Sequence, residues 1–165
     1  YQRNIGGTQG QEKETVIAIR GLNDGEDLKS IFSIFSRRLP VQFNDTVAFI
    51  DKACEKFGIP HNKIELVGHS LGGYLARTVS RVRDFQRSWC FGGPGPDEKT
   101  QAALTALHPS RLPNDSVINV RSRFDIVALF GPDEKNTIEL DTPFLHHDVA
   151  HISYALARKA GVRYS

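Results

Sequence analysis

One stretch, residues 64–76, constrains the fold of this chain more than any other. It reads IELVGHSLGGYLA, in which a β-type apolar run enters a Gly-His-Ser-Leu-Gly turn and a helix-type run leaves it. A serine that must project from the end of a sheet needs a tight turn, and Gly68 and Gly72 remove the side chains that would crowd it. The spacing therefore predicts Ser70 as a nucleophile. A glycine-rich turn with an incidental serine is the less favoured interpretation.

Strand-type and helix-type patterns alternate along the rest of the chain. Short apolar runs predict strands, and apolar positions at helical spacing predict helices. The predicted strands are 14–20, 64–67, 88–91, 116–120 and 137–140, and the predicted helices are 24–39, 44–57, 71–82, 97–107 and 148–161. This alternation indicates an α/β fold with a mostly parallel central sheet and helices on both faces. We expect a single domain over residues 1–165, with the polar residues 1–13 poorly ordered.

An acid that would orient a catalytic base is expected after a later strand. Active groups of parallel sheets collect at the carboxyl ends of the strands, and in folds with this turn the chain order is Ser, acid, His. Asp125 comes just after the strand at 116–120 and is flanked by apolar residues, as suits a partly buried carboxylate. A loop aspartate paired with a neighbouring arginine is the alternative. Asp115 and Asp133 are weaker candidates because neither directly follows a strand.

Three histidines lie after the last predicted strand, where the base belongs. We favour His151, in the first turn of the last helix, with His147 second and His146 as a further alternate. The remaining histidines either lie beside Ser70 in sequence or precede the serine or the acid in chain order: His61, His69 and His108.

Two backbone N–H groups are expected to form an oxyanion hole. The turn supplies the N–H of Leu71, and the loop after the first strand supplies the N–H of Leu22, which follows Gly21. Losing one such donor typically raises the barrier by about 3 kcal/mol.

Several motifs resemble one family. The GHSLGG sequence at 68–73 resembles the nucleophile elbow of the class 3 (fungal-type) lipases and related bacterial phospholipases. In the same order, IAIRG at 17–21 is similar to the family's oxyanion segment, CFGGP at 90–94 to its next strand and turn, and FDIV at 124–127 to its acid motif. The resemblance implies an α/β-hydrolase fold and a lipid ester hydrolase that needs no cofactor and no metal. Leu22 stands where the family has a hydroxyl residue, which leaves only a backbone donor there.

The function expected from these features is a serine carboxylic ester hydrolase of the lipase or phospholipase type, acting through a Ser-His-Asp triad and an acyl-enzyme. A small-ester esterase or thioesterase and a non-catalytic binding module of the same fold are the alternatives. A remote one is a zinc protease, because HDVAH at 147–151 has the spacing of the HExxH motif with Asp in place of Glu. The apolar stripe at 28–39 is interpreted as core rather than as a lid.

Composition excludes some partners. A net charge of +2 is too small to indicate nucleic-acid binding. Four arginines (Arg77, Arg81, Arg83 and Arg87) form a basic patch around the helix after Ser70, and we expect Arg77 and Arg81 to face solvent. A transient contact with an anionic membrane surface is one interpretation of this patch, and a solvated helix face is the favoured one. The partner expected from the motifs is a lipid or ester substrate, and nothing in the sequence indicates an oligomeric state.

The cellular location stays open. The two cysteines, Cys54 and Cys90, do not form a disulfide framework, so a reducing compartment is the mild default. No stretch approaches the roughly 20 apolar residues of a membrane span, and the first residues contain no apolar signal-peptide core. The chain does not begin with Met, and a processed or excised part of a longer protein is one expectation. A cytoplasmic protein and the effector domain of a secreted bacterial protein are both consistent with these features.

Overall fold

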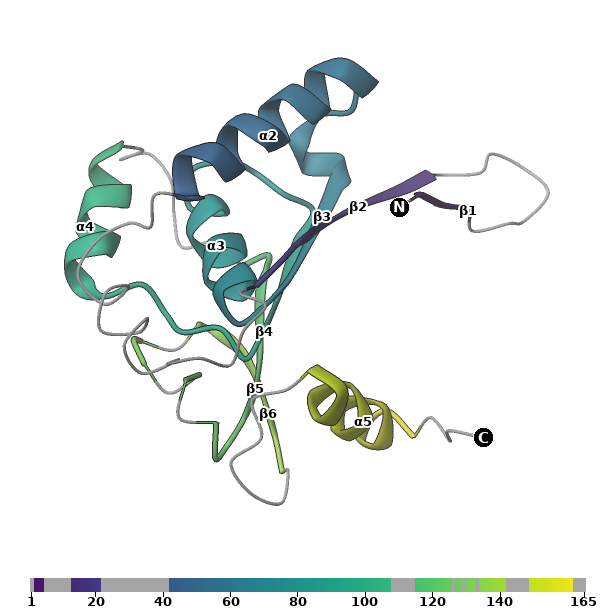
Figure 1. The fold of residues 1–165 in the computed structure, drawn as a ribbon, viewed down its shortest axis with the longest axis vertical. Helices are drawn as coiled ribbons and strands as arrows, with labels where there is room; N and C mark the ends of the chain where they lie inside the picture. Colours follow the sequence, from purple (N-terminus) through teal and green to yellow (C-terminus); the bar gives the residue numbers. More distant parts are fainter. Residues whose placement is uncertain are drawn as a thin grey trace.

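A six-stranded sheet runs through the centre of the molecule (Figure 1). The computed structural model describes residues 2–4, 13–21, 42–107, 115–125, 127–128, 130–132, 134–141 and 149–161. The strands lie side by side in chain order, β1 is antiparallel to β2, and all later pairs are parallel. They are β1 (Gln2–Asn4), β2 (Lys13–Ile19), β3 (Ile64–His69), β4 (Arg87–Phe91), β5 (Val117–Ser122) and β6 (Asn136–Leu140).

Helices cover both faces of this sheet. Parallel strands in sequential order need crossovers that all advance in one direction, and right-handed crossovers then place their helices on one face. Accordingly α2 (Gln42–Phe57), α3 (Leu71–Val79) and α4 (Glu98–Leu107) lie on one side, and α5 (Val149–Lys159), which follows the last strand, lies on the other (Figure 1). A short 3₁₀ helix, His61–Lys63, leads into β3. The predicted α/β fold is therefore confirmed.

Each face of the sheet has its own apolar core. On the first, Ile50 of α2, Leu75 of α3 and Cys90 of β4 are buried together. On the second, Ile152 of α5 packs with Val120 of β5 and Leu140 of β6. Neighbouring residues of one strand point to opposite faces, so β4 sends Cys90 to one core while Trp89 and Phe91 pack against the other. This explains why its sequence reads as a continuous apolar run rather than an alternating one.

Predicted and observed elements agree within a few residues where both are described. Helix α2 begins at Gln42, two residues before the predicted start, and α3 ends at Val79 rather than continuing to 82. The predicted helix over 24–39 falls outside the described residues. Strand β1 was not predicted, because its polar residues carry no apolar pattern and its pairing with β2 is made by the backbone. No helix in the described parts of the chain combines the length and apolarity that a membrane crossing requires.

One prediction about the helix after Ser70 is wrong. Arg77 and Arg81 were expected to face solvent, but the Arg77 side chain is only 1% exposed and that of Arg81 is 21% exposed. Both guanidinium groups donate hydrogen bonds to the carboxylate of Glu134. The physical reason is that Pro132 and Glu134 lie against this side of the helix and the residues after it, so both guanidinium groups meet acceptors there instead of solvent.

Candidate active site

Ser70 occupies a strained position between β3 and α3. Its backbone has φ 57° and ψ −121°, and it is the one non-glycine residue with positive φ in the described part of the chain. Side chains in this region cost roughly 1–3 kcal/mol unless the surroundings hold them there. Two backbone hydrogen bonds do so: the Ser70 N–H donates to Phe91 O at 2.9 Å, and the Tyr74 N–H donates to Ser70 O at 3.0 Å. This is the geometry that raises a serine above the end of a parallel sheet.

Close backbone approach explains the two glycines that flank the turn. A Cβ atom on Gly68 would lie 2.1 Å from Gly72 O, and one on Gly72 would lie 2.1 Å from Ile19 O. Neither position could carry a side chain without moving the backbone of its neighbour. The strand, the turn and the start of α3 are therefore packed as one unit against the end of β2.

The end of β2 also lies against Ser70. A Cβ atom on Gly21 would be 3.5 Å from the Ser70 Cβ, so the loop after β2 begins next to the candidate nucleophile. Leu71 is the first residue of α3, and its N–H belongs to the unpaired N-terminal turn of a helix, which favours negative charge. Leu22, the second predicted oxyanion donor, falls outside the described residues.

Asp125 is held in the turn after β5. Its side chain is buried, with 1% of the residue exposed. The carboxylate oxygen Oδ1 accepts hydrogen bonds from the N–H groups of Val127 at 3.0 Å and Ala128 at 3.4 Å, and the Asp125 N–H donates to Ser122 O at 3.2 Å. These bonds set the orientation of the carboxylate. A buried carboxylate fixed by backbone donors is what an orienting acid requires.

Ser70 and Asp125 lie at the same edge of the sheet. Ser70 directly follows His69, which pairs with Phe91 of β4, and Phe91 pairs in turn with Val120 of β5. One strand separates β3 from β5, which corresponds to two spacings of about 4.8 Å each. This register places Ser70 and Asp125 after the carboxyl ends of two strands of the same sheet, with one strand between them.

The three candidate bases follow the last strand. The backbone of His151 lies in the first turn of α5, and its side chain, like His146 and His147, is outside the described residues. The next residue, Ile152, is fully buried against β5 and β6, which anchors the start of the helix to the sheet. The two histidine side chains of the 147–151 motif, on which the zinc alternative depends, are therefore also outside the described residues.

Other candidates are accounted for. His61 contacts Asp51 at 2.7 Å, at the opposite edge of the sheet from Ser70. Asp115 precedes β5, is exposed and pairs with Lys135 at 3.1 Å, while Asp133 falls outside the described residues. Burial raises the pKa of the Cys90 thiol to about 12, so this cysteine stays protonated and is not a competing nucleophile.

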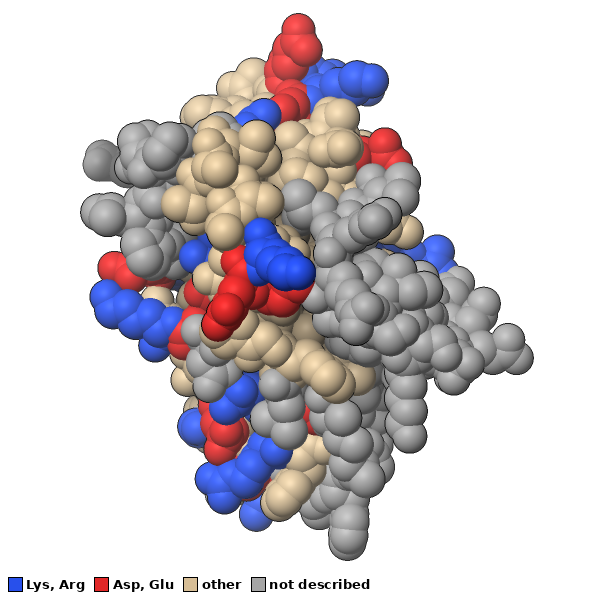
Figure 2. All heavy atoms as spheres, turned by 90° about the vertical axis from the view of Figure 1, so that its left-hand side faces the viewer, with Lys and Arg blue, Asp and Glu red and all other residues tan. Residues whose placement is uncertain are grey.

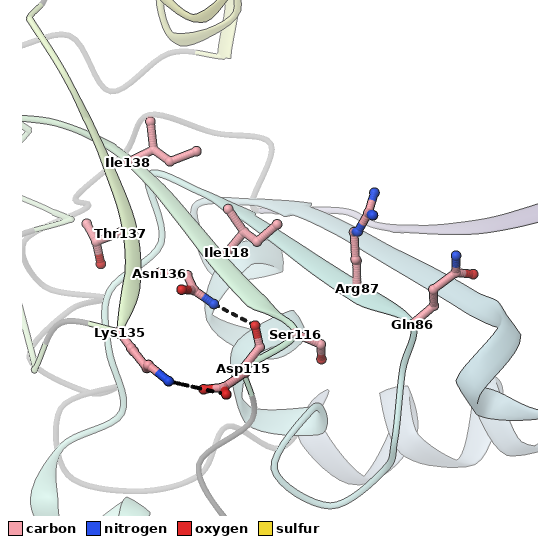
Figure 3. A pocket seen from close by; sticks show the side chains of 9 residues that line it. All are labelled: Gln86, Arg87, Asp115, Ser116, Ile118, Lys135, Asn136, Thr137 and Ile138. Carbon is pink, nitrogen blue, oxygen red and sulfur yellow. Dashed lines mark hydrogen bonds and ion pairs between the residues drawn. The ribbon is translucent and has the colours of Figure 1, made fainter.

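Two cavities lie away from this edge. One, of about 570 Å³, opens where β4, β5 and β6 begin and is lined by Arg87, Asp115, Lys135 and Asn136 among others (Figure 3). Its Lys135 and Asp115 neutralise one another. The other, of about 410 Å³, is an apolar groove between α2 and the β2 edge, lined by Phe49 and Phe57. Neither is lined by Ser70 or Asp125.

Acidic and basic side chains are intermingled on the face that Figure 2 shows. The predicted basic patch is divided among several carboxylates. Arg83 pairs with Asp51 at 2.7 Å and Arg87 lies 3.6 Å from Glu65, in addition to the two arginines that contact Glu134. The four arginines therefore do not form an unneutralised cationic surface.

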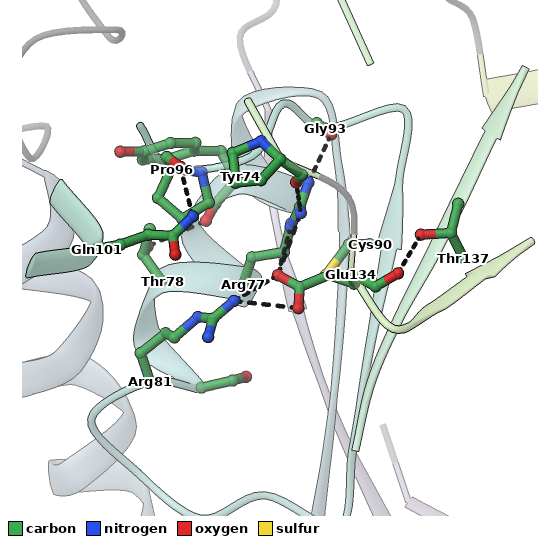
Figure 4. A network of polar contacts seen from close by, with 12 residues as sticks. Tyr74, Arg77, Thr78, Arg81, Cys90, Gly93, Pro96, Gln101, Glu134 and Thr137 are labelled. Atoms are coloured by element: carbon green, nitrogen blue, oxygen red, sulfur yellow. Dashed lines mark hydrogen bonds and ion pairs between the residues drawn. The ribbon is translucent and has the colours of Figure 1, made fainter. Parts of the chain in front are cut away.

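Sequence reasoning missed a polar network beside the site. Arg77 of α3 joins Glu134 and the turn after β4 (Figure 4). The signals were an arginine within an otherwise apolar helix and the GGPGP run at 92–96. Their connection to Glu134 depends on residues more than fifty positions apart, which no local pattern indicates.

Comparisons with known proteins support the fold. No family model and no curated protein sequence matches this chain. The solved structure of MGS-MChE2, an α/β hydrolase enzyme from the metagenome of sediments from the lagoon of Mar Chica, Morocco, is similar with a TM-score of 0.50 and 11% identity, covering 89% of this chain and 88% of that one. YahD, solved with malic acid, has a TM-score of 0.47 and 13% identity over 73% of this chain. The match spans 61% of YahD, less than two thirds of its length. The chain has the α/β-hydrolase fold.

Proposed function

We propose that this chain is a serine carboxylic ester hydrolase of the lipase or phospholipase type. The observation that carries the proposal is the positive φ of Ser70 on a strand-to-helix turn that glycines at 68 and 72 make room for. A strained non-glycine residue is retained only where its surroundings force it, and such positions cluster at active sites. The buried carboxylate of Asp125 at the same edge of the sheet supports the assignment of an orienting acid.

The proposed mechanism uses side chains and backbone donors of this chain alone. Ser70 Oγ attacks the ester carbonyl while a histidine, His151 in the favoured assignment, takes its proton and returns it to the leaving alcohol. The Asp125 carboxylate, whose Oδ1 is held by two backbone donors, accepts the hydrogen bond of the imidazolium. The N–H groups of Leu71 and Leu22 stabilise the oxyanion. Water then releases the acid from the acyl-enzyme by the same steps.

Apolar side chains around the acid favour a lipid substrate over a small polar ester. Phe124 and Phe130, on the turn that carries Asp125, are 51% and 48% exposed. Exposed aromatic side chains at the rim of a site suit an acyl chain or a lipid surface. They support the resemblance to class 3 lipases and a transient membrane contact better than the arginines do, because those arginines are paired with carboxylates.

Covalent labelling tests the proposal directly. A fluorophosphonate probe should label the intact protein once, and Ser70→Ala should abolish the label, because only an activated serine attacks the phosphorus. Ser153→Ala, which removes an exposed serine of α5, is the matched control and should label normally. An intact protein that is not labelled would reject the hydrolase assignment in favour of a binding module. Labelling that persists in the presence of a strong chelator would support the serine hydrolase over the zinc protease.

Two further measurements assign the base and the substrate. His151→Ala should lower kcat by roughly 10³-fold or more, whereas His146→Ala and His147→Ala should retain most activity. Unchanged turnover in His151→Ala would move the base to His147 or His146.

The substrate class needs a separate panel. p-Nitrophenyl esters of increasing acyl length, compared with phospholipid vesicles, distinguish a lipase or phospholipase from a small-ester esterase. A thioester substrate completes that panel.

A further inference from the structure

The guanidinium group of Arg77 joins three segments around the candidate site. It lies on α3, the helix that begins directly after Ser70, and its side chain is 1% exposed. Its Nη1 donates to Gly93 O at 3.4 Å, in the turn after β4. Its Nη2 donates to Pro132 O at 2.9 Å and to the Glu134 carboxylate at 3.1 Å, and its Nε donates to the same carboxylate at 3.2 Å. Figure 4 shows the side chains of Arg77 and Arg81 both reaching the Glu134 carboxylate from the helix.

Pro132 and Glu134 belong to the segment that follows Asp125, so the network continues to the acid. The Phe130 N–H donates to Val127 O at 3.3 Å, and the Val127 N–H donates to Asp125 Oδ1 at 3.0 Å. The segment is also tied to the turn after β4, because the Gly95 N–H donates to Phe130 O at 2.7 Å. Hydrogen bonds, joined by the backbone from Phe130 to Pro132, therefore connect Arg77 to the Asp125 carboxylate.

The turn after β4 connects the same network to the nucleophile. A Cβ atom on Gly93 would lie 2.9 Å from Ser70 O and 2.8 Å from Tyr74 N, so this turn is packed against the start of α3. Arg77 thus contacts a segment that touches Ser70 and a segment that holds Asp125. A planar fork with five donors can bridge several acceptors at once in a way that the single ammonium of lysine cannot.

We propose that Arg77 is a positioning residue that fixes the distance between Ser70 and the Asp125 carboxylate. The inference rests on the proposed hydrolase function for its kinetic consequence, but the mechanical link between α3 and the acid segment stands separately. Arg77 touches neither substrate nor the reacting atoms. It acts by holding the backbone that carries the orienting acid, where small displacements of a catalytic group lower the rate.

Arg83 is a matched control. It lies just beyond α3 and makes a two-bond ion pair with Asp51, at 3.0 and 2.7 Å, but that pair connects to α2 and not to the acid segment. Arg83→Met therefore removes an arginine–carboxylate pair from the same side of the molecule without disturbing Asp125. It should reduce stability and leave turnover of a soluble p-nitrophenyl ester within about twofold of the native value.

A double-mutant cycle tests the kinetic role. Arg77→Met should lower kcat by roughly 10- to 100-fold with little change in KM, because it displaces the acid rather than the substrate. In an Asp125→Asn background the same substitution should slow turnover by no more than about twofold further, because the group it positions is already gone. Arg77→Lys keeps the positive charge next to Glu134 and should fold. Its kcat should lie between that of the native protein and that of Arg77→Met. Multiplicative losses in the cycle, or an equal loss in Arg83→Met, would overturn the positioning role.

Hydrogen exchange separates this inference from the hydrolase proposal. In Arg77→Met, the amides of Val127 and Ala128 should exchange at least roughly tenfold faster, while amides of α2 keep their native rates. Unchanged protection at Val127 and Ala128 would show that Arg77 does not hold the acid segment, whatever the activity. If the native protein neither reacts with a fluorophosphonate nor turns over esters, the proposed function fails, and the exchange experiment still decides the link.

Discussion

At the scale of single residues, strain at Ser70 is the feature that most distinguishes a functional turn from a structural one. The φ of 57° is unfavourable for any residue with a Cβ atom, and glycine would relieve it. A chain selected only for stability would place glycine at this position. The strain at a serine is what the proposed role of its hydroxyl as nucleophile would require of this turn.

This strain can be measured with two variants that both lack the hydroxyl. Ser70→Gly should be more stable than Ser70→Ala by about 1 kcal/mol, because glycine gains more from the relieved backbone than it loses in unfolded-state entropy. Both should fail to react with a fluorophosphonate. Urea unfolding of the two proteins gives the difference. An alanine variant at least as stable as the glycine variant would show that the turn is not strained.

Replacing a glycine of this chain by alanine should reduce the free energy of unfolding by an amount that depends on what surrounds the new Cβ atom. Gly68→Ala should lose about 3 kcal/mol or more of unfolding free energy and should lose labelling, because its Cβ atom would lie 2.1 Å from Gly72 O. Gly58 has φ 63°, but a Cβ atom there would meet nothing within 4 Å, so Gly58→Ala should lose only about 1 kcal/mol and label normally. Equal losses in the two variants, measured by urea unfolding, would contradict the steric explanation.

At the scale of elements, α5 carries the favoured base, and Ile152 is the one buried side chain among those that the structure describes on this helix. Ile152 is fully buried against Val120 and Leu140. Ile152→Ala should cost about 3 kcal/mol by leaving a cavity, and it should also lower kcat because the helix that carries His151 loses its anchor. Ser153→Ala, on the exposed side of the same helix, is the control for both readouts. Thermal unfolding and ester turnover would measure them, and full activity in a destabilised Ile152→Ala would argue against His151 as the base.

Elements with a local signature were predictable from the sequence. The turn around Ser70 and the buried strands follow from glycine spacing and short apolar runs, because both are set by neighbours in sequence. Asp125 could be chosen because it follows a strand that the apolar run at 116–120 predicts. The orientation of its carboxylate could not be predicted, because it depends on the backbone N–H groups of Val127 and Ala128 that donate to it.

Features that depend on distant segments were not predictable. The position of Arg77 on α3 matches an outward-facing site, but Pro132 and Glu134 lie against its side chain, and Glu134 is 57 positions away in sequence. The pairing of β1 with β2 is likewise a backbone interaction that leaves no pattern in side chains. The choice among His146, His147 and His151 is of the same kind, since it depends on how the last helix approaches the acid.

At the scale of the whole molecule, ion pairs reinforce contacts between elements that already share one apolar core. Asp51 on α2 accepts hydrogen bonds from Arg83 beyond α3 and contacts His61 before β3. The Arg83 guanidinium is the main cause that lowers the pKa of Asp51 below its ordinary value of 3.8, against a smaller opposing effect of burial, and His61 adds to the lowering. The pair therefore links protonation to the packing of these three elements.

Acid should weaken this link in a defined pH range. Because the folded pKa lies below the unfolded one, the unfolded state binds more protons as the pH falls, so the stabilisation is complete well above pH 3.8 and is lost as the pH falls through the lowered folded value. The side chain of Asp51 is 36% exposed, which limits the contribution to about 1 kcal/mol or less. Urea unfolding of Asp51→Asn between pH 3 and 7 should show a deficit in unfolding free energy at neutral pH that shrinks toward the acid end. Arg83→Met should reproduce most of that deficit, and the double variant should add little to it, whereas fully additive losses would mean that the two residues act independently.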